Sequence, residues 1–458
     1  GNSWYTVKNF GTMEINSGVT IKNKGSFSSA IANGWQNAAT AGEGSEPAHS
    51  ADAVLTINGG DISGGKITVK NDDCGILTIN GGTFTQSGSN LFCIYNANVA
   101  KITGGTINGY VGNIESNSSE YNKGEFTITG GAFTDLANAV KYAADGAIIK
   151  LAGDVTVTKP IEVTKSMTLD LNGHVLTAAT ASQNDAKNSP IWVTAKNVNL
   201  TIDGTAAGSG MKMGDTHDTN WEAKVWGFVD LRPGSDGSTV TVNGGRYVGS
   251  TCASDNNHYT ALFTVGSESK LILNNVSAET DERVVKARSC GEVIVSGGTY
   301  NITGINAFLG AAFETKTASF TNMKLTAKYG GCVQVGSNAT LENCEIKVTD
   351  NRTGAGTHLN CAVAVQYGGT ATVKSGIYTA PYAAYVYSSG GTINIENGTF
   401  TGVVRADATT DATATINIKN GSFKGDIQKS GGPGSETITI TGGLFSSKPA
   451  KECIANGY

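Results

Sequence analysis

LTINGGTFT, residues 77–85, joins an alternating segment to a turn, and ITITGGLFS repeats the combination at residues 438–446. In the first copy Leu77 and Ile79 alternate with polar residues, which is the period of a β-strand that buries one face. The Gly-Gly pair that follows suits a turn with positive φ, which glycine and asparagine adopt at the least steric cost. A phenylalanine comes after the turn in both copies. The phrase therefore predicts a half-buried strand that ends in a tight turn.

Further copies of the phrase recur along the chain at a nearly constant spacing. They lie at 55–63, 126–134, 240–248, 293–301, 392–401 and 415–424. From Gly244 onward the turn positions are Asn274, Gly297, Asn322, Asn343, Ser375, Asn397, Asn420 and Gly442. Before several of these turns stands a second short alternation, such as Phe263-Thr264-Val265. Two or three short strands per repeat of this length are typical of a coil that stacks on its neighbours.

The repeat predicts an all-β fold, a right-handed parallel β-helix with coils of about 22–25 residues. Stacking places equivalent residues of successive coils in one ladder, with a rise per coil of roughly 4.8 Å. A β-propeller is excluded, because its blades need about 40–50 residues each. An array of β-sandwiches would not keep one motif in phase over so many copies.

The composition indicates a secreted protein with a mostly uncharged polar surface. Charged residues make up 16% of the 458 residues, well below the roughly 25% of an average protein, so threonine, serine, asparagine and glycine must cover the surface. The net charge of −5 and the lack of a basic tract exclude nucleic acid as a partner. No apolar run approaches the roughly 18 residues of a membrane span, so we expect no membrane insertion by this chain. An extracellular or cell-surface location is expected.

The eight cysteines show no metal-binding or redox motif, since neither a CxxC nor a Cys/His spacing is present. Cys93 precedes Ile94 as Cys332 precedes Val333, and in both cases the next turn follows at the same phase. That position lies on a strand. The pattern favours buried thiols that pack as small hydrophobic residues, with disulfides as the alternative.

The repeat is interrupted near 135–145, where a helical period replaces the alternation. Asp135 can cap a helix and Gly146 can end it. The apolar face of this helix comprises Leu136, Ala139, Val140 and Ala143. A helix at the open end of a β-helix would cover its exposed strand edges. We therefore predict a first β-helix segment at 1–134 and a second at 135–458 that begins with this short capping helix, and leave open whether the two form one interrupted solenoid.

The chain resembles known β-helical proteins at two levels. The stretch LANAVKYAADGAIIKLAGDVTVTKPIEVTKSMTLDLNGHVLT, residues 136–177, resembles the start of pectate-lyase-like β-helix domains, where a short helix, a glycine turn and a strand lead into the first coil. The GG-x-F phrases and the closing GGLFSSKPAKECIANGY resemble β-helix segments of large surface proteins from gut Gram-positive bacteria. The resemblance implies architecture rather than activity, because lyases, hydrolases, adhesins and passive stalks share this scaffold.

The resemblance carries no catalytic residue over to this chain. Pectate lyases of the superfamily use an acidic calcium-binding cluster and a basic residue, and no stretch here matches that pattern. Polygalacturonase-like enzymes carry paired aspartates and a Gly-His-Gly motif, whereas Gly173-His174-Val175 lacks the second glycine. His174 is therefore interpreted as a structural residue, and the catalytic residues stay unassigned.

Four long insertions, at 211–224, 251–259, 280–288 and 349–360, fall at one phase of the repeat. Loops at one phase of a solenoid emerge on one edge and line up. The candidate ligand-binding residues on this edge are Asp215, His217, Asp218, Trp221, Glu222, Asp255, His258, Tyr259, Arg283, Asp350, Arg352 and His358. Their carboxylates suit Ca²⁺ or acid–base chemistry, and their aromatic rings suit sugar faces. The alternative is that they are ordinary solvated loop residues. We expect no cofactor or bound metal, with Ca²⁺ as the alternative.

Three functions compete. The first is a non-catalytic extracellular or cell-surface module, a stalk or an adhesin that binds a glycan or a host ligand, and we favour it because the surface is uniform and no catalytic cluster is matched. The second is a polysaccharide lyase or glycoside hydrolase with its groove along the aligned loops, which would require two carboxylates, or Ca²⁺ and a base, to converge. The third, a spike-like trimer, would require an apolar outward face, against which the outward threonines and asparagines argue.

Overall fold

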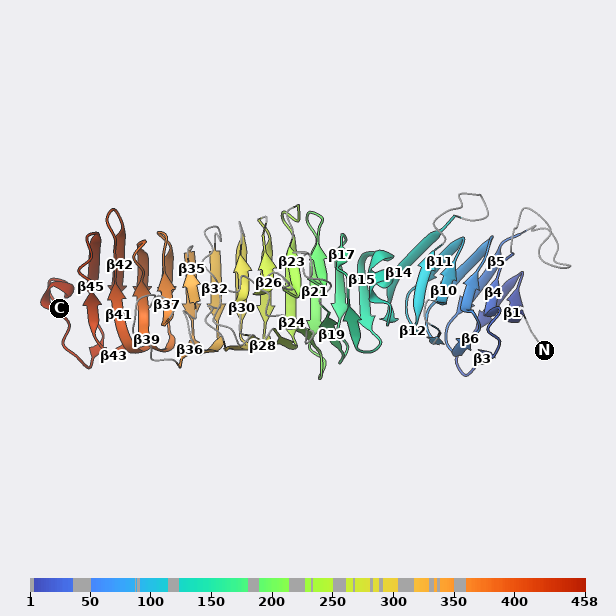
Figure 1. The fold of residues 1–458 in the computed structure, drawn as a ribbon, viewed down its shortest axis with the longest axis horizontal. Helices are drawn as coiled ribbons and strands as arrows, with labels where there is room; N and C mark the ends of the chain where they lie inside the picture. Colours follow the sequence, from blue (N-terminus) through green and yellow to red (C-terminus); the bar gives the residue numbers. More distant parts are fainter. Residues whose placement is uncertain are drawn as a thin grey trace. The chain divides into compact units, whose positions relative to one another are not determined.

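The computed structural model consists almost entirely of short parallel β-strands that stack coil upon coil (Figure 1). The residues it describes are 4–35, 51–86, 88, 91–113, 123–179, 189–213, 227–231, 234–249, 261–266, 268–280, 283–287, 291–303, 317–328, 333–335, 338–349 and 360–458. The chain divides into two compact units, which are Gly1–Val155 with Lys165–Val175 (unit 1) and Thr156–Thr164 with Leu176–Tyr458 (unit 2). Residue 135, where we predicted the boundary, lies within unit 1.

Each coil of unit 1 contributes strands to three faces. The first face comprises β1 (Tyr5–Asn9), β4 (Ser29–Asn33), β7 (Ile67–Asn71), β10 (Phe92–Asn96) and β13 (Tyr110–Asn113). The second comprises β2 (Thr12–Ile15), β5 (Ala53–Ile57), β8 (Gly75–Ile79), β11 (Val99–Ile102) and the start of β14 (Glu125–Phe133). The third comprises β3 (Thr20–Asn23), β6 (Asp61–Gly64), β9 (Thr83–Thr85), β12 (Thr106–Asn108) and the end of β14, with which the end of β15 (Ala143–Leu151) pairs, followed by β18 (Met167–Asp170).

Unit 2 repeats this plan. Its first face comprises β17 (Ile161–Val163), β20 (Ile191–Val193), β23 (Val229–Leu231), β26 (Ala261–Val265) and β29 (Arg283–Ala287), and later β34 (Val333–Val335), β37 (Cys361–Val365) and β44 (Ile427–Lys429). Its second comprises β21 (Asn199–Gly204), β24 (Thr239–Gly244), β27 (Lys270–Asn274), β30 (Glu292–Ser296), β32 (Thr317–Thr321), β35 (Asn338–Glu342), β38 (Thr370–Val373), β40 (Gly391–Ile395), β42 (Thr413–Ile418) and β45 (Ser435–Ile440).

The third face of unit 2 completes each coil. It comprises β22 (Gly210–Met213), β25 (Arg246–Val248), β28 (Ser277–Thr280), β31 (Thr299–Ile302), β33 (Lys324–Ala327), β36 (Cys344–Val348), β39 (Gly376–Val386), β41 (Thr399–Ala406), β43 (Ser422–Lys424) and β46 (Leu444–Phe445). The long strands β39 and β41 bend from the third face into the first. Strands β16 (Val155–Val157) and β19 (Val175–Ala178) contain the points of division between the units, and a 3-10 helix, η2 (Lys451–Cys453), follows β46.

Strand register confirms the parallel β-helix and its coil length. Leu55 pairs with Leu77, the equivalent leucine of the next coil. In unit 2, Thr392 pairs with Thr415, and Thr415 pairs with Thr437. The partners in each pair stand about 22 residues apart, which is a coil length typical of a solenoid. The repeated phrase of one coil therefore lies beside the phrase of the next, as the spacing of the turns predicted.

Inward aromatic residues form stacks along the coils. Tyr378, Phe400, Phe423 and Phe445 follow one another with ring centroids 4.9, 5.1 and 4.9 Å apart and interplanar angles of 15°, 9° and 9°. This spacing matches the distance between neighbouring strands, so in these four coils the aromatic residue after the turn packs directly on its counterpart. The aromatic residue of the phrase is thus a core residue.

At the Gly-Gly pairs of the repeated phrase in unit 1, one glycine of each pair has the positive φ that the sequence predicts for the turn. Positive φ falls on the second glycine, as at Gly82 (φ +104°). A Cβ atom there would lie 2.9 Å from the carbonyl oxygen of Gly60, the equivalent residue of the preceding coil. The second glycine is therefore required twice, by its backbone conformation and by the close approach of the stacked turn.

The predicted helix is present but shorter than expected. Helix α1 (Leu136–Lys141) begins at Asp135, whose carboxylate accepts hydrogen bonds from the backbone N–H of Asn138 at 3.3 Å and from that of Val111 at 3.1 Å. The predicted apolar face is buried. Gly146 does not end the helix, because β15 already begins at Ala143. Since β14 pairs with β15 past the helix, α1 covers the edge of β13 rather than the open end of a solenoid.

Five stacked asparagines, four of them buried and Asn113 half-buried, form a ladder inside unit 1 that we did not predict. Each of the five strands of its first face ends in asparagine. The side-chain amide nitrogen of each asparagine donates to the side-chain oxygen of the asparagine in the next strand. The order is Asn9, Asn33, Asn71, Asn96 and Asn113, and the four N–O distances are 2.7, 2.8, 2.7 and 2.8 Å. Stacked amides satisfy both the donor and the acceptor of each buried side chain.

Two buried tyrosines lead to predictions of opposite sign. The Tyr378 hydroxyl donates to the Ser375 carbonyl oxygen at 2.9 Å, whereas the Tyr247 hydroxyl has no hydrogen-bond partner among the described residues. Burial raises the pKa of both hydroxyls, so they stay neutral. Tyr247→Phe is expected to raise the free energy of unfolding by about 1 kcal/mol, and Tyr378→Phe to lower it by about 1 kcal/mol. Urea unfolding measures both, and equal effects of the two substitutions would contradict the expectation.

The cysteines within the described residues agree with the prediction of thiols. Cys74, Cys93, Cys344, Cys361 and Cys453 are buried thiols outside any disulfide. Burial raises the pKa of Cys93 to about 12, so its thiol is unreactive at neutral pH. Cys332 lies outside the described residues. None of the helices in the part of the chain that the structure describes is long and apolar enough to cross a membrane.

Candidate functional site

Most of the predicted loop residues lie outside the part of the chain that the structure describes. These are Asp215, His217, Asp218, Trp221, Glu222, Asp255, His258, Tyr259, Asp350, Arg352 and His358. Arg283 is described, as the half-buried first residue of β29, where it pairs in register with Ala261. The predicted alignment of these loops on one edge therefore stays a prediction, as does Ca²⁺ binding by their carboxylates.

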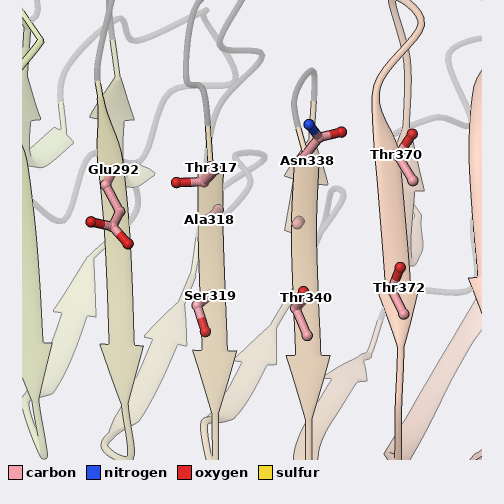
Figure 2. Close-up of a pocket in the computed structure, with 9 residues that line it drawn as sticks. Glu292, Thr317, Ala318, Ser319, Asn338, Thr340, Thr370 and Thr372 are labelled. Carbon is pink, nitrogen blue, oxygen red and sulfur yellow. The ribbon is translucent and has the colours of Figure 1, made fainter.

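A shallow depression lies elsewhere, on the outer surface of the second face of unit 2, across β30, β32, β35 and β38 (Figure 2). Its volume is about 410 Å³. The residues that line it are Glu292, Thr317, Ala318, Ser319, Asn338, Ala339, Thr340, Thr370 and Thr372. We call it the threonine depression.

The alternation of each strand places these polar side chains on one surface. Ser319 pairs in register with Thr340, and Thr340 with Thr372, so three hydroxyls lie side by side in one ladder. Thr317, Asn338 and Thr370 form the neighbouring ladder (Figure 2). Along a strand the two ladders are two residues apart, roughly 6.6 Å, and across strands the spacing is roughly 4.8 Å. The result is a flat grid of short hydrogen-bonding groups.

Small inward residues lie beneath the grid. Ala318, Ala339 and Ala371 occupy one buried ladder in three successive coils. Val293 and Ile393 hold the same ladder position in the coils on either side. Because alanine fills less of the interior than valine or isoleucine, the depression coincides with the coils that have the smallest inward side chains.

The threonine depression carries little net charge. Glu292, the one carboxylate among the described residues that line it, forms an ion pair with Lys270 at 2.6 Å. At the border of the depression, Lys374 stands two residues after Thr372, and its ammonium group forms an ion pair with the carboxylate of Glu342 at 3.0 Å. Ionic groups at the border are thus already neutralised, and the grid itself offers hydroxyl and amide groups that both donate and accept hydrogen bonds. This surface suits an uncharged ligand rich in hydroxyl groups.

The described lining of the depression can be compared with the groups that hydrolysis requires. Glycoside hydrolysis generally uses two carboxyl groups on either side of the scissile bond. Among the described residues that line the threonine depression, one carries a carboxylate, Glu292, and Lys270 pairs with it. The described lining offers groups that can orient a ligand by hydrogen bonds, without the two carboxyl groups of that mechanism.

Elsewhere in unit 2, Asp407 and Glu436 meet at the hydroxyl of Ser430. Asp407 also accepts a hydrogen bond from the Tyr385 hydroxyl at 2.9 Å. Burial of Glu436 opposes its ionisation, but hydrogen bonds from Ser430 and from the backbone N–H groups of three loop residues together lower its pKa. A carboxylate with a lowered pKa is a poor general acid, so this pair organises the loop between β44 and β45.

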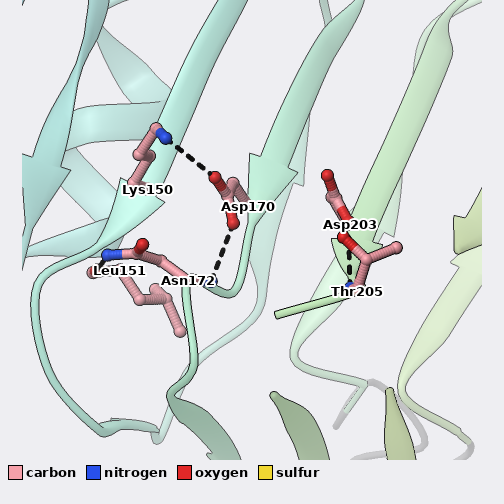
Figure 3. Close-up of polar contacts among 6 residues, drawn as sticks. All are labelled: Lys150, Leu151, Asp170, Asn172, Asp203 and Thr205. Carbon is pink, nitrogen blue, oxygen red and sulfur yellow. Dashed lines mark hydrogen bonds and ion pairs between the residues drawn. The ribbon is translucent and has the colours of Figure 1, made fainter. Parts of the chain in front are cut away.

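Polar contacts at two other turns are likewise structural (Figure 3). In unit 1, Asp170 pairs with Lys150 at 3.1 Å and accepts the backbone N–H of Asn172 at 2.7 Å. In unit 2, Asp203 accepts the backbone N–H and the hydroxyl of Thr205 at 3.0 and 2.6 Å. These carboxylates fix turns. Within the described ranges, no group of three or more histidine, cysteine, aspartate or glutamate side chains could hold a metal ion.

The threonine depression was not among our predicted sites, although the sequence contains a signal for it. Three successive coils carry a polar–Ala–polar triplet at the same phase, Thr317-Ala318-Ser319, Asn338-Ala339-Thr340 and Thr370-Ala371-Thr372. Strand period and coil spacing together would have placed these residues on one surface.

No protein-family model matches the sequence, and comparisons with curated proteins and with solved structures found no match. The resemblance to pectate-lyase-like domains and to surface proteins of gut bacteria therefore stays a prediction, and the parallel β-helix itself is established by strand register alone.

Proposed function

We propose that this chain is a non-catalytic extracellular or cell-surface β-helix module that binds a neutral glycan through the threonine depression. The observation that supports this most is the flat grid of hydroxyl and amide groups on three adjacent coils, bordered by neutralised charges. A glycan presents hydroxyl groups at regular intervals, and each can exchange hydrogen bonds with such a grid.

The repeating geometry favours an extended chain that lies across the strands. Ser319, Thr340 and Thr372 repeat once per coil along the solenoid axis. An extended polymer of pyranose units also advances by about one strand spacing per sugar, so successive sugars would meet equivalent side chains. Individually weak hydrogen bonds then add up along the chain.

The test is a glycan array combined with a polysaccharide-degradation screen on the purified chain, with and without Ca²⁺. We expect binding of neutral linear glycans without turnover. The double substitution Thr340→Ala/Thr372→Ala is expected to weaken binding about 10- to 30-fold, because two hydrogen bonds of about 1 kcal/mol each are lost. Thr201→Ala/Thr241→Ala is the matched control, since these threonines occupy the same outward ladder away from the depression.

Two results would contradict the proposal. One is equal weakening by both double substitutions, which would show that the depression is not the site. The other is release of new reducing ends or unsaturated uronides that disappears in His217→Ala/Asp218→Ala, which would identify a polysaccharide lyase or hydrolase with its site on the insertion loops.

A further inference from the structure

Three tyrosines cluster on the outer surface of unit 2 where β39 bends into the first face. The rings of Tyr382 and Tyr385 stack with centroids 5.1 Å apart at 22°, and those of Tyr385 and Tyr387 meet edge to face at 5.8 Å. Tyr385 is buried, while Tyr382 and Tyr387 are half-buried and pack against the cluster formed with Cys361 and Ala364. The surface therefore presents parts of the Tyr382 and Tyr387 rings, both of which pack against the buried ring of Tyr385.

The central ring is fixed in place. The Tyr385 hydroxyl donates to Asp407 Oδ2 at 2.9 Å, and the Ser430 hydroxyl lies 2.9 Å from the other carboxylate oxygen, Oδ1. Burial and this hydrogen bond raise the pKa of Tyr385, so the hydroxyl keeps its proton. A platform whose rings are already immobilised loses little conformational entropy when a ligand stacks on it.

Arg405 lies directly beside this platform. It pairs in register with Tyr385 across β39 and β41, so the two side chains project from the same surface of the sheet. Its Nε atom is buried without a hydrogen-bond partner, and within the described part of the chain Arg405 forms no ion pair. Asp407, two residues away, is already engaged by Tyr385 and Ser430. A partly buried guanidinium without an anionic partner in its own chain is suited to bind an anion from outside the chain.

We propose that Tyr382, Tyr387 and Arg405 form a second binding site, which takes a sugar that bears a carboxylate or sulfate group. The guanidinium forms a two-pronged hydrogen-bonded pair with the anion, for which its planar fork is suited. The tyrosine rings contact the apolar face of the sugar ring. This site lies on the first face of unit 2 and is independent of the threonine depression on the second face.

The test uses three sugars that share one core, namely lactose, 3′-sialyllactose and 3′-sulfolactose, with binding to the full chain measured by calorimetry or ligand-observed NMR. At least one anionic sugar is expected to bind ten or more times more tightly than lactose. Arg405→Gln is expected to weaken that binding about 10- to 100-fold, the loss of a hydrogen bond to a charged group. Arg405→Lys keeps the charge but not the fork and is expected to recover only part of the affinity.

Two controls and one further substitution within the site separate this site from a general effect of charge or folding. Lys419→Gln removes one exposed positive charge from another face and is expected to leave binding unchanged. Tyr382→Ala is expected to weaken binding of the anionic sugar about tenfold with no change in strand content by circular dichroism. Thr340→Ala/Thr372→Ala should have no effect here, so failure at one site does not decide the other. Unchanged affinity in Arg405→Gln, equal affinity for lactose, or no binding of either anionic sugar would each overturn the proposal.

Discussion

Replacement of Asn71 by leucine is expected to lower the free energy of unfolding of unit 1 by about 3–5 kcal/mol, the largest effect we foresee for a polar residue. Asn71 is fully buried in the middle of the asparagine ladder. Its amide accepts from Asn33 at 2.8 Å and donates to Asn96 at 2.7 Å, and it also donates to the carbonyl oxygens of Gly75 and Val99. Leucine fills a similar volume but leaves several buried polar atoms without a partner, each at a cost of about 1–3 kcal/mol.

Hydrogen exchange on the full chain can locate this loss, because amides of β4, β7 and β10 should exchange faster while those of unit 2 keep their protection. Asn58→Ala is the matched control. Asn58 also stacks on asparagines of adjacent coils, donating to Asn16 at 3.0 Å and accepting from Asn80 at 2.8 Å, but this outer ladder is exposed to water. Its loss is expected to cost less than about 1 kcal/mol. An effect of Asn58→Ala as large as that of Asn71→Leu would mean that burial does not set the energy of the ladder.

Phe423→Ala is expected to destabilise unit 2 by about 3–5 kcal/mol, because it removes a large buried side chain and leaves a cavity. Phe423 lies between Phe400 and Phe445 in the stack, with centroids 5.1 and 4.9 Å away. The neighbouring rings belong to separate coils whose backbones are held by strand pairing, so they have little freedom to close the gap.

Urea unfolding of unit 2 measures this loss of unfolding free energy. Two further substitutions separate the contribution of buried volume from that of ring stacking. Phe423→Leu keeps most of the apolar volume and is expected to cost about 0.5–1.5 kcal/mol through lost ring stacking. Phe445→Ala removes the last, half-buried ring of the stack and should cost less than Phe423→Ala. If Phe445→Ala were the more damaging of the two, stacking at the end of the solenoid, and not burial at its centre, would dominate the stability.

The strand-and-turn phrase was sufficient to predict the parallel β-helix and its coil length. Alternation at Leu77 and Ile79 fixed which side chains face inward, and the spacing of the turns fixed the pairing register, as the partnership of Thr392 with Thr415 confirms. The cap at Asp135 was also predictable, since a carboxylate at a helix start satisfies backbone N–H groups locally. The end of α1 was not, because strand pairing of β15 overrides the local signal of Gly146.

The candidate sites depended on features that lie outside any one segment. The threonine depression combines residues from four coils, from Glu292 to Thr372, and its depth coincides with alanines that no single strand reveals. The isolation of Arg405 arises because Asp407, its nearest carboxylate in the sequence, is engaged by Ser430 from another coil. Strand period and coil length together would have placed the triplets of the depression on one surface, but the engagement of Asp407 by Ser430 cannot be read from either.

The repeated features, namely the strands, the turns, the inward aromatic residues and the length of the coil, were predictable from the sequence, because they follow from backbone geometry and from burial of alternate side chains. The differences in environment between copies of one repeated residue became visible only in the folded chain. Asn58 and Asn71 are both stacked asparagines, yet one is exposed and the other is buried. The physical reason is that burial, hydrogen-bond satisfaction and charge pairing are set by residues of adjacent coils, which stand a full coil away in the chain.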